Sequence, residues 1–100
     1  MKGLLFATAI TAGLLLPVYA QESEVGRRQE RQQERIAEGA NTGKLSPGQT
    51  ARLEHKEKQI HREVKRDRAA NGGTLTPHEK AKVNHQENRV SRRIRHDKHT

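Results

Sequence analysis

Apolar side chains recur along this chain at intervals of seven and four residues, and the same intervals occur in two segments. They stand at offsets 0, +7 and +11, first as Leu53, Ile60 and Val64 and then as Val83, Val90 and Ile94. Such offsets keep side chains on one face of an α-helix. Val25 and Ile36 mark the ends of a similar face in the preceding segment.

This pattern predicts an all-α fold of three helices, near Glu24–Glu38, Pro47–Ala69 and Pro77–Asp97. Two Gly-containing loops join the predicted helices, and short connections favour antiparallel neighbours. The alternative is that the three helices form only transiently and do not pack against one another.

The apolar face is narrow, because offset +4 carries a polar residue in each segment, as Gln29, Glu57 and Glu87. Burying one large aliphatic side chain contributes about 1.5–3 kcal/mol, whereas ordering one residue costs about 1–2 kcal/mol of backbone entropy. Ten such side chains follow residue 20: Val25, Ile36, Leu45, Leu53, Ile60, Val64, Leu75, Val83, Val90 and Ile94. We therefore expect a marginal core, and either a marginally stable monomer or a fold that depends on a partner or on self-association as a homodimer.

The sequence contains a duplicated loop-helix unit of 30 residues. Residues 41–70 align with residues 71–100 without a gap, and nine aligned pairs are identical, including His55 and His85. A period of this length is typical of helical repeats. We interpret each copy as a turn followed by a long helix.

Each copy opens its predicted helix with capping residues. Ser46 precedes a proline and is followed three residues later by Gln49, and Thr76 and Glu79 occupy the same offsets in the second copy. A Ser or Thr at the N-cap accepts a hydrogen bond from the first turn, and Gln or Glu at the third helical position bonds back to the N-cap N–H. Proline suits the first helical position. The sequence thus predicts a capping box at the start of each helix.

The first twenty residues are predicted to be a secretory signal peptide. Lys2 provides a positive start, the segment Gly3–Leu16 is apolar, and Val18 and Ala20 occupy the small-residue positions of a cleavage site before Gln21. This arrangement is typical of export signals. The alternative is a single-pass membrane anchor with a soluble tail.

Cleavage would leave residues 21–100 as a single small helical domain with no transmembrane segment. That domain has no aromatic residue and no cysteine, because the only Phe and Tyr of the chain belong to the signal. We expect it to be periplasmic or secreted.

The exported chain is strongly basic. The formal net charge of +8 becomes +7 on removal of the signal, because Lys2 is the only charged residue that is lost. Basic proteins attract anionic lipid, phosphate groups and acidic proteins, and after export nucleic acid is an unlikely partner. The candidate binding surface is a basic helical face formed by Arg62, Lys65, Arg66, Arg92, Arg93 and Arg95. A solvated helix face with mixed charges and no ligand is the alternative interpretation.

Histidine side chains suggest a second kind of site, one that binds a metal ion. Two pairs have helical spacing, Glu57 with His61 and His96 with His99. Pairs of this kind can hold Zn²⁺ or Cu²⁺, so these four residues are candidate metal ligands. Scattered surface histidines on charged helices are the alternative.

The loop before each predicted helix resembles that of the EF-hand family. With Gly73 at loop position 6, Leu75 and Glu79 fall at positions 8 and 12, and the resemblance implies a helix-loop-helix pair. Calcium also needs oxygen ligands at positions 1, 3 and 5. Those positions hold Arg68, Ala70 and Gly72 in the second loop and Glu38, Ala40 and Thr42 in the first. A vestigial structural module that does not bind calcium is one reading of these loops.

The same residues resemble a second family. The stretches LSPGQ (Leu45–Gln49) and LTPHE (Leu75–Glu79) are similar to the LTxxQ motif of the Spy/CpxP family, and the second departs from it with Glu in place of Gln. The resemblance implies a small periplasmic all-helical protein, usually dimeric, that is linked to envelope stress and to holding unfolded clients. The chain is also similar in general pattern to small exported bacterial helical proteins.

The sequence offers no nucleophile elbow, phosphate-binding Gly-rich loop or other enzymatic constellation. We therefore expect a non-enzymatic binding or envelope-stress protein that contacts anionic surfaces or acidic and unfolded clients. A periplasmic buffer of divalent metal ions, built on the histidines, is the alternative.

The EF-hand comparison gives a first testable prediction. Millimolar Ca²⁺ should leave the helical circular dichroism signal and the melting temperature unchanged, because neither loop has oxygen-bearing side chains at all three of positions 1, 3 and 5. A calcium-dependent rise in melting temperature would contradict this expectation.

Overall fold

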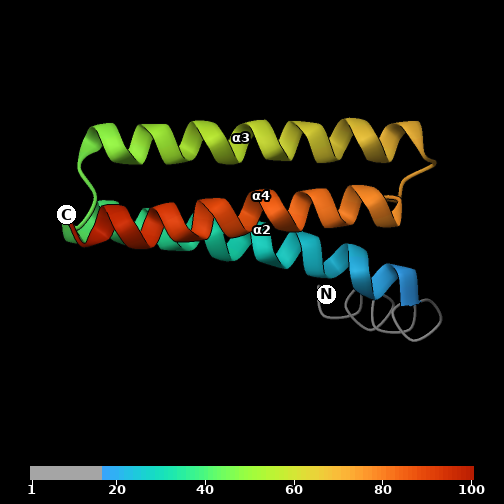
Figure 1. Cartoon of the computed structure of the whole chain (residues 1–100), viewed down its shortest axis with the longest axis horizontal. Helices are drawn as coiled ribbons and strands as arrows, with labels where there is room; N and C mark the ends of the chain where they lie inside the picture. The colour runs from blue at the N-terminus through green and yellow to red at the C-terminus, as the bar shows by residue number, and fades with distance from the viewer. Residues whose placement is uncertain (1–16) are drawn as a thin grey trace, which may run out of the picture.

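Three long helices joined by two tight loops make up the described chain (Figure 1). The computed structural model describes the backbone of residues 17–100 and the side chains of residues 24–100. Helix α2 spans Pro17–Thr42, α3 spans Pro47–Ala70 and α4 spans Pro77–Lys98. The described residues contain no strand, so the predicted all-α fold of three helices is confirmed.

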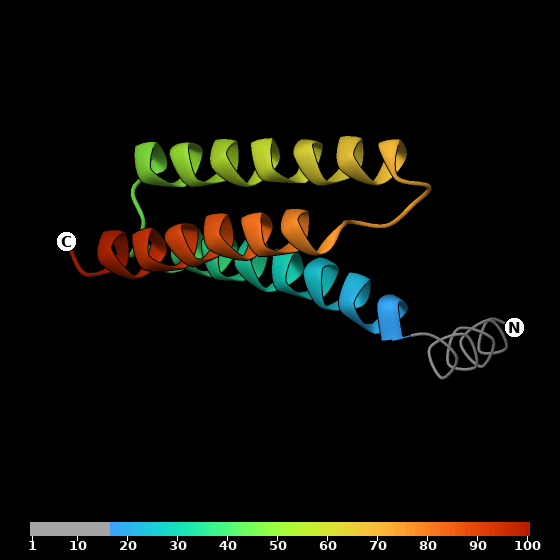
Figure 2. The ribbon, with the colours of Figure 1, turned by 45° about the vertical axis from the view of Figure 1, so that its right-hand side comes forward.

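Helix α3 runs antiparallel to both α2 and α4, which lie side by side and run in the same direction (Figure 2). Lys82 of α4 forms an ion pair with Glu63 of α3. Ser91 of α4 accepts a hydrogen bond from Arg35 of α2, and Arg28 of α2 donates one to the side chain of Asn88. Helices α2 and α3 also pack against each other, so all three helices contact one another.

The predicted signal peptide falls almost entirely on residues 1–16, which lie outside the described residues. Its last four residues, 17–20, form the first turn of α2, and cleavage between Ala20 and Gln21 stays a prediction. In the part of the chain that the structure describes, no helix is long and apolar enough to span a membrane.

Helix α2 continues four residues past its predicted end at Glu38 because Gly39 does not interrupt it. The helix ends instead before Gly43, whose φ of +80° is in the left-handed region that favours glycine. Gly39 has a different role, since it lets Leu45 of the following loop fold back onto the helix. A Cβ on Gly39 would lie 2.6 Å from the Leu45 Cδ1.

The core contains every large aliphatic side chain that follows residue 20, each at most 6 % exposed. In α3 and α4 the buried positions are separated alternately by four and three residues, which is the spacing of helices that pack side by side. These positions are Leu53, Glu57, Ile60 and Val64 in α3, and Val83, Glu87, Val90, Ile94 and Asp97 in α4.

The polar residues at offset +4 lie inside the bundle and do not interrupt its face. Glu57 is 2 % exposed and Glu87 is 0 % exposed, and Gln29 of α2 is 9 % exposed. Gln32 is also buried and donates a hydrogen bond from Nε2 to the backbone oxygen of Glu87 at 3.0 Å. The bundle therefore has polar groups within an already small apolar core.

Both capping boxes are closed. Ser46 N donates to Gln49 Oε1 at 2.9 Å and Gln49 N donates to Ser46 Oγ at 3.1 Å. Thr76 and Glu79 make the same two bonds at the same distances. The hydrogen bond from the Thr76 backbone N–H lowers the pKa of the Glu79 carboxyl. These bonds satisfy N–H groups that a helix start otherwise leaves unpaired.

The caps give a prediction for stability. Replacing Ser46 or Thr76 with Ala should lower the free energy of unfolding by about 0.5–2 kcal/mol, because the N–H group of Gln49 or Glu79 loses its acceptor. Urea denaturation followed by circular dichroism measures this loss. Pro77→Ala, which leaves both bonds of its box intact, should cost less, and equal stability of the two cap variants and the unmodified chain would contradict the proposed contribution of the caps.

The two glycines inside α2 give a second prediction. Gly26→Ala should stabilise the protein by up to about 1 kcal/mol through helix propensity, because a Cβ there has nothing within 4 Å. Gly39→Ala gains the same propensity but forces Leu45 away, and overpacking of this kind costs about 1–3 kcal/mol. We expect Gly39→Ala to melt below Gly26→Ala in thermal denaturation. Equal melting temperatures would show that Leu45 does not need the space at Gly39.

Candidate anion-binding groove

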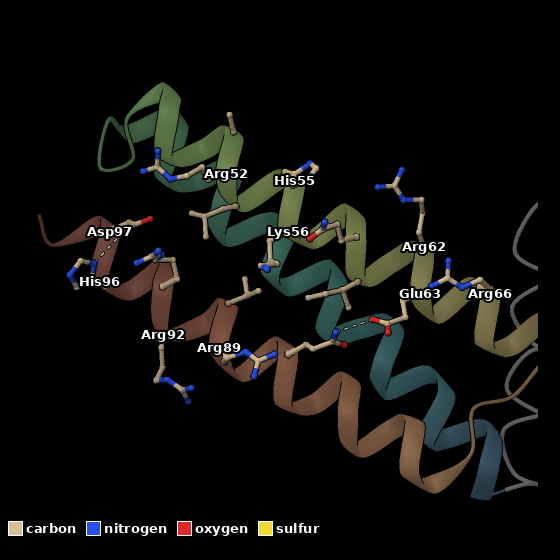
Figure 3. Close-up of a pocket in the computed structure, with 17 residues that line it drawn as sticks. Arg52, His55, Lys56, Arg62, Glu63, Arg66, Arg89, Arg92, His96 and Asp97 are labelled. Atoms are coloured by element: carbon tan, nitrogen blue, oxygen red, sulfur yellow. Dashed lines mark hydrogen bonds and ion pairs between the residues drawn. The ribbon is translucent and has the colours of Figure 1, made fainter.

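An open groove of about 1220 Å³ lies between α3 and α4 (Figure 3). Leu53, Ile60 and Val90 line its floor, although each is at most 3 % exposed. Long polar side chains therefore cover the apolar floor. Seven of the side chains that line the groove are basic: Arg52, Lys56, Arg62 and Arg66 from α3, and Arg89, Arg92 and Arg93 from α4.

The helical register explains why these basic residues line one groove. Arg52 and Lys56 directly precede the core positions 53 and 57, and Arg89 and Arg93 directly precede the core positions 90 and 94. Antiparallel packing of α3 and α4 turns these two flanks toward each other. Their aliphatic stems can cover the floor while the charged groups stay in water.

The side chains differ in direction (Figure 3). Lys56 and Arg89 extend into the space between α3 and α4, whereas Arg62 and Arg92 extend away from it at the two rims. Cations thus line both the interior and the edges of the groove.

The two carboxylates that line the groove have other partners. Glu63 accepts hydrogen bonds from Lys82 Nζ at 2.6 Å and from Gln86 Nε2 at 2.9 Å. The bond from Lys82 is the main reason that the pKa of Glu63 is lowered. Asp97 is 5 % exposed and lies 3.3 Å from His96 Nδ1.

Among the seven basic groups, only Arg66 acts on one of these carboxyls, since its charge also lowers the pKa of Glu63. Within residues 24–100 none of them makes an ion pair, and none makes a hydrogen bond. Their charges therefore add up to a positive field along the groove, and low-dielectric walls concentrate such a field. Guanidinium groups also match the geometry of carboxylate and phosphate groups. Chemically, the groove is suited to bind an elongated anion.

The structure divides the basic face that the sequence predicts. Arg62, Arg66, Arg92 and Arg93 line the groove, whereas Lys65 and Arg95 are exposed elsewhere on the same helices. Sequence reasoning did not single out Arg52, Lys56 and Arg89. The sequence feature that could have identified these three residues is their position directly before a core residue.

The candidate metal ligands on α3 point to different environments. Glu57 is buried in the bundle, while His61 is exposed. Burial, followed by the hydrogen bond and the charge of Glu87, raises the pKa of Glu57 to about 9. A carboxyl in that environment favours its protonated form, which is a poor metal ligand.

The candidate ligands on α4 have separate partners. His96 Nδ1 faces Asp97, and His99 Nδ1 lies 2.7 Å from the backbone oxygen of Arg95. Among the residues that the structure describes, no three His, Cys, Asp or Glu side chains converge on a position where a metal ion could bind. Zinc or copper binding stays a prediction from the sequence.

Comparisons with family models, with curated proteins and with solved structures found no match. The resemblances to the Spy/CpxP and EF-hand families therefore rest on their short motifs alone.

Proposed function

We propose that this protein is an exported, non-enzymatic binding protein that holds acidic segments of client polypeptides in the groove between α3 and α4. The observation that carries the proposal is the set of seven basic side chains that line one groove without ion pairs among the described residues. A role in the envelope-stress response fits the predicted export signal and the motif resemblance.

The shape of the site favours a polypeptide over a flat anionic surface. The basic groups lie on two facing helices, along a groove that is hollowed between them. A segment seated there meets cations on both sides, while a lipid surface would meet only the groups at the rims. Carboxylates spaced along an extended or helical client can pair with successive arginines.

The proposal is tested by titrating the full chain with a short Glu-rich peptide that carries a fluorophore. Binding should weaken from low salt to about 0.15 M, where screening acts over about 8 Å. Arg52→Gln, Arg89→Gln and Arg93→Gln combined should weaken it by a factor between about 3 and about 150, since each exposed charge pair contributes about 0.2–1 kcal/mol.

The control variant combines Lys58→Gln, Lys65→Gln and Arg95→Gln, which removes the same net charge from exposed positions outside the groove. It should weaken binding much less than the groove variant. Equal losses in both variants would show that net charge alone attracts the peptide. Binding to anionic vesicles but not to the peptide would assign the protein to the membrane surface instead.

The metal-buffer alternative predicts the opposite behaviour. Uptake of Zn²⁺ or Cu²⁺ would resist salt, and His96→Ala with His99→Ala would abolish it. The groove variant would leave it unchanged. Such a result would replace the proposed function.

A further inference from the structure

The interior of the bundle contains two carboxyl groups that face each other from adjacent helices. Glu57 of α3 and Glu87 of α4 are 2 % and 0 % exposed, and their side chains lie within hydrogen-bonding reach. They occupy aligned positions in the sequence, where aliphatic residues would be expected. Nothing in the proposed function uses them.

The hydrogen bonding around this pair is incomplete. Both carboxyl oxygens of Glu87 and Oε2 of Glu57 are buried, and no described residue donates a hydrogen bond to them. An ionised carboxylate has acceptors only, so two carboxylates cannot bond to each other. A proton on either one supplies the missing donor and removes the repulsion between two buried charges.

The charged groups around the pair do not neutralise it. The positive charge of Arg28 on α2 attracts the ionised Glu57 carboxylate, and the negative charge of Glu54 on α3 repels it. Arg35 of α2 is connected to the pair only through another residue. It donates hydrogen bonds to Gln32 Oε1 and to Ser91, and Gln32 donates a hydrogen bond to the backbone oxygen of Glu87. Arg28 donates instead to the side chain of Asn88, and neither carboxyl oxygen of Glu87 has a hydrogen-bond partner among the described residues.

We infer that Glu57 and Glu87 form a buried proton-binding site that must hold a proton for α3 and α4 to stay closed. The ligand of this site is the proton itself, shared between two carboxyl oxygens. Because α3 and α4 also form the walls of the groove, loss of the proton loosens the interface from which the groove is built.

The sign of the pH dependence follows from the direction of the shift. The pKa of Glu57 is raised in the folded protein, from 4.5 to about 9. Below pH 4.5 Glu57 holds its proton in both the folded and the unfolded chain, so the stability that this proton contributes is fully present. As pH rises from 4.5 toward about 9, Glu57 releases its proton in the unfolded chain but keeps it in the folded chain. The free energy of unfolding therefore falls progressively.

The test measures the unfolding equilibrium constant of the full chain by urea denaturation between about pH 5 and pH 8, with EDTA present. Relative to Glu57→Gln, the constant of the unmodified chain should rise about tenfold for each pH unit, the limit for one proton. At the upper end of this pH range Glu57→Gln should be more stable than the unmodified chain, because the Gln amide can donate a hydrogen bond to Glu87 without taking up a proton from solvent.

Glu87→Gln is the second variant and should show a weaker pH dependence than the unmodified chain, because it removes the charge of Glu87 while Glu57 stays buried. Glu34→Gln, which removes one exposed carboxylate from α2, should keep the pH profile of the unmodified chain. Parallel profiles for the unmodified chain and both buried variants would overturn the inference. So would a loss of stability at pH 8 that EDTA causes and Zn²⁺ or Ca²⁺ reverses, since a metal ion would then occupy the place of the proton.

Discussion

The close approach of two carboxyl groups inside a very small apolar core is the constraint on which this structure depends. Ten aliphatic side chains hold three helices together, and Glu57 and Glu87 lie among them. A buried pair of like charges would oppose the packing of α3 against α4 with a cost of several kcal/mol for each ion. With a proton between them, the same two residues become a hydrogen-bonded link across that interface.

The groove and the core share one helical register. Core positions in α3 and α4 are spaced alternately by four and three residues, and the residues that precede them, except the one before Val83, line the groove. At Arg52, Arg89 and Arg93 those preceding residues are arginines, whose aliphatic stems can cover the apolar floor. Changing the packing of α3 on α4 therefore changes the width of the groove, which connects the buried pair with the proposed binding site.

Much of the fold could be predicted from the sequence because its signals are local. Ser46 and Thr76 mark helix starts through their own hydrogen bonds, and the apolar spacing identifies the residues that pack. The end of α2 was not predictable, since Gly39 resembles a helix stop until Leu45 is seen to pack against it.

The sites were harder to predict because they depend on neighbours from other helices. A glutamate at position 57 or 87 looks like a break in an apolar face, and only the antiparallel register shows that the two meet in the interior. Arg52 and Arg89 likewise belong to separate stretches of sequence until α3 and α4 pack together. The pairing of Glu57 with His61 as metal ligands stays a prediction, which was made without knowing that Glu57 is buried and His61 is exposed.

The most direct test of the account is a pH titration of the glutamate side-chain carboxyl carbons by NMR, with the Glu57 and Glu87 signals assigned from the two Gln variants. The account predicts that one resonance of the pair titrates far above the ordinary glutamate value of 4.5 while the protein stays folded, and that the pKa of Glu57 falls in Glu87→Gln, which removes the charge of Glu87 but not the burial of Glu57. Titration of every glutamate near pH 4.5 would contradict the account, because the bundle would then hold two buried carboxylates without a proton.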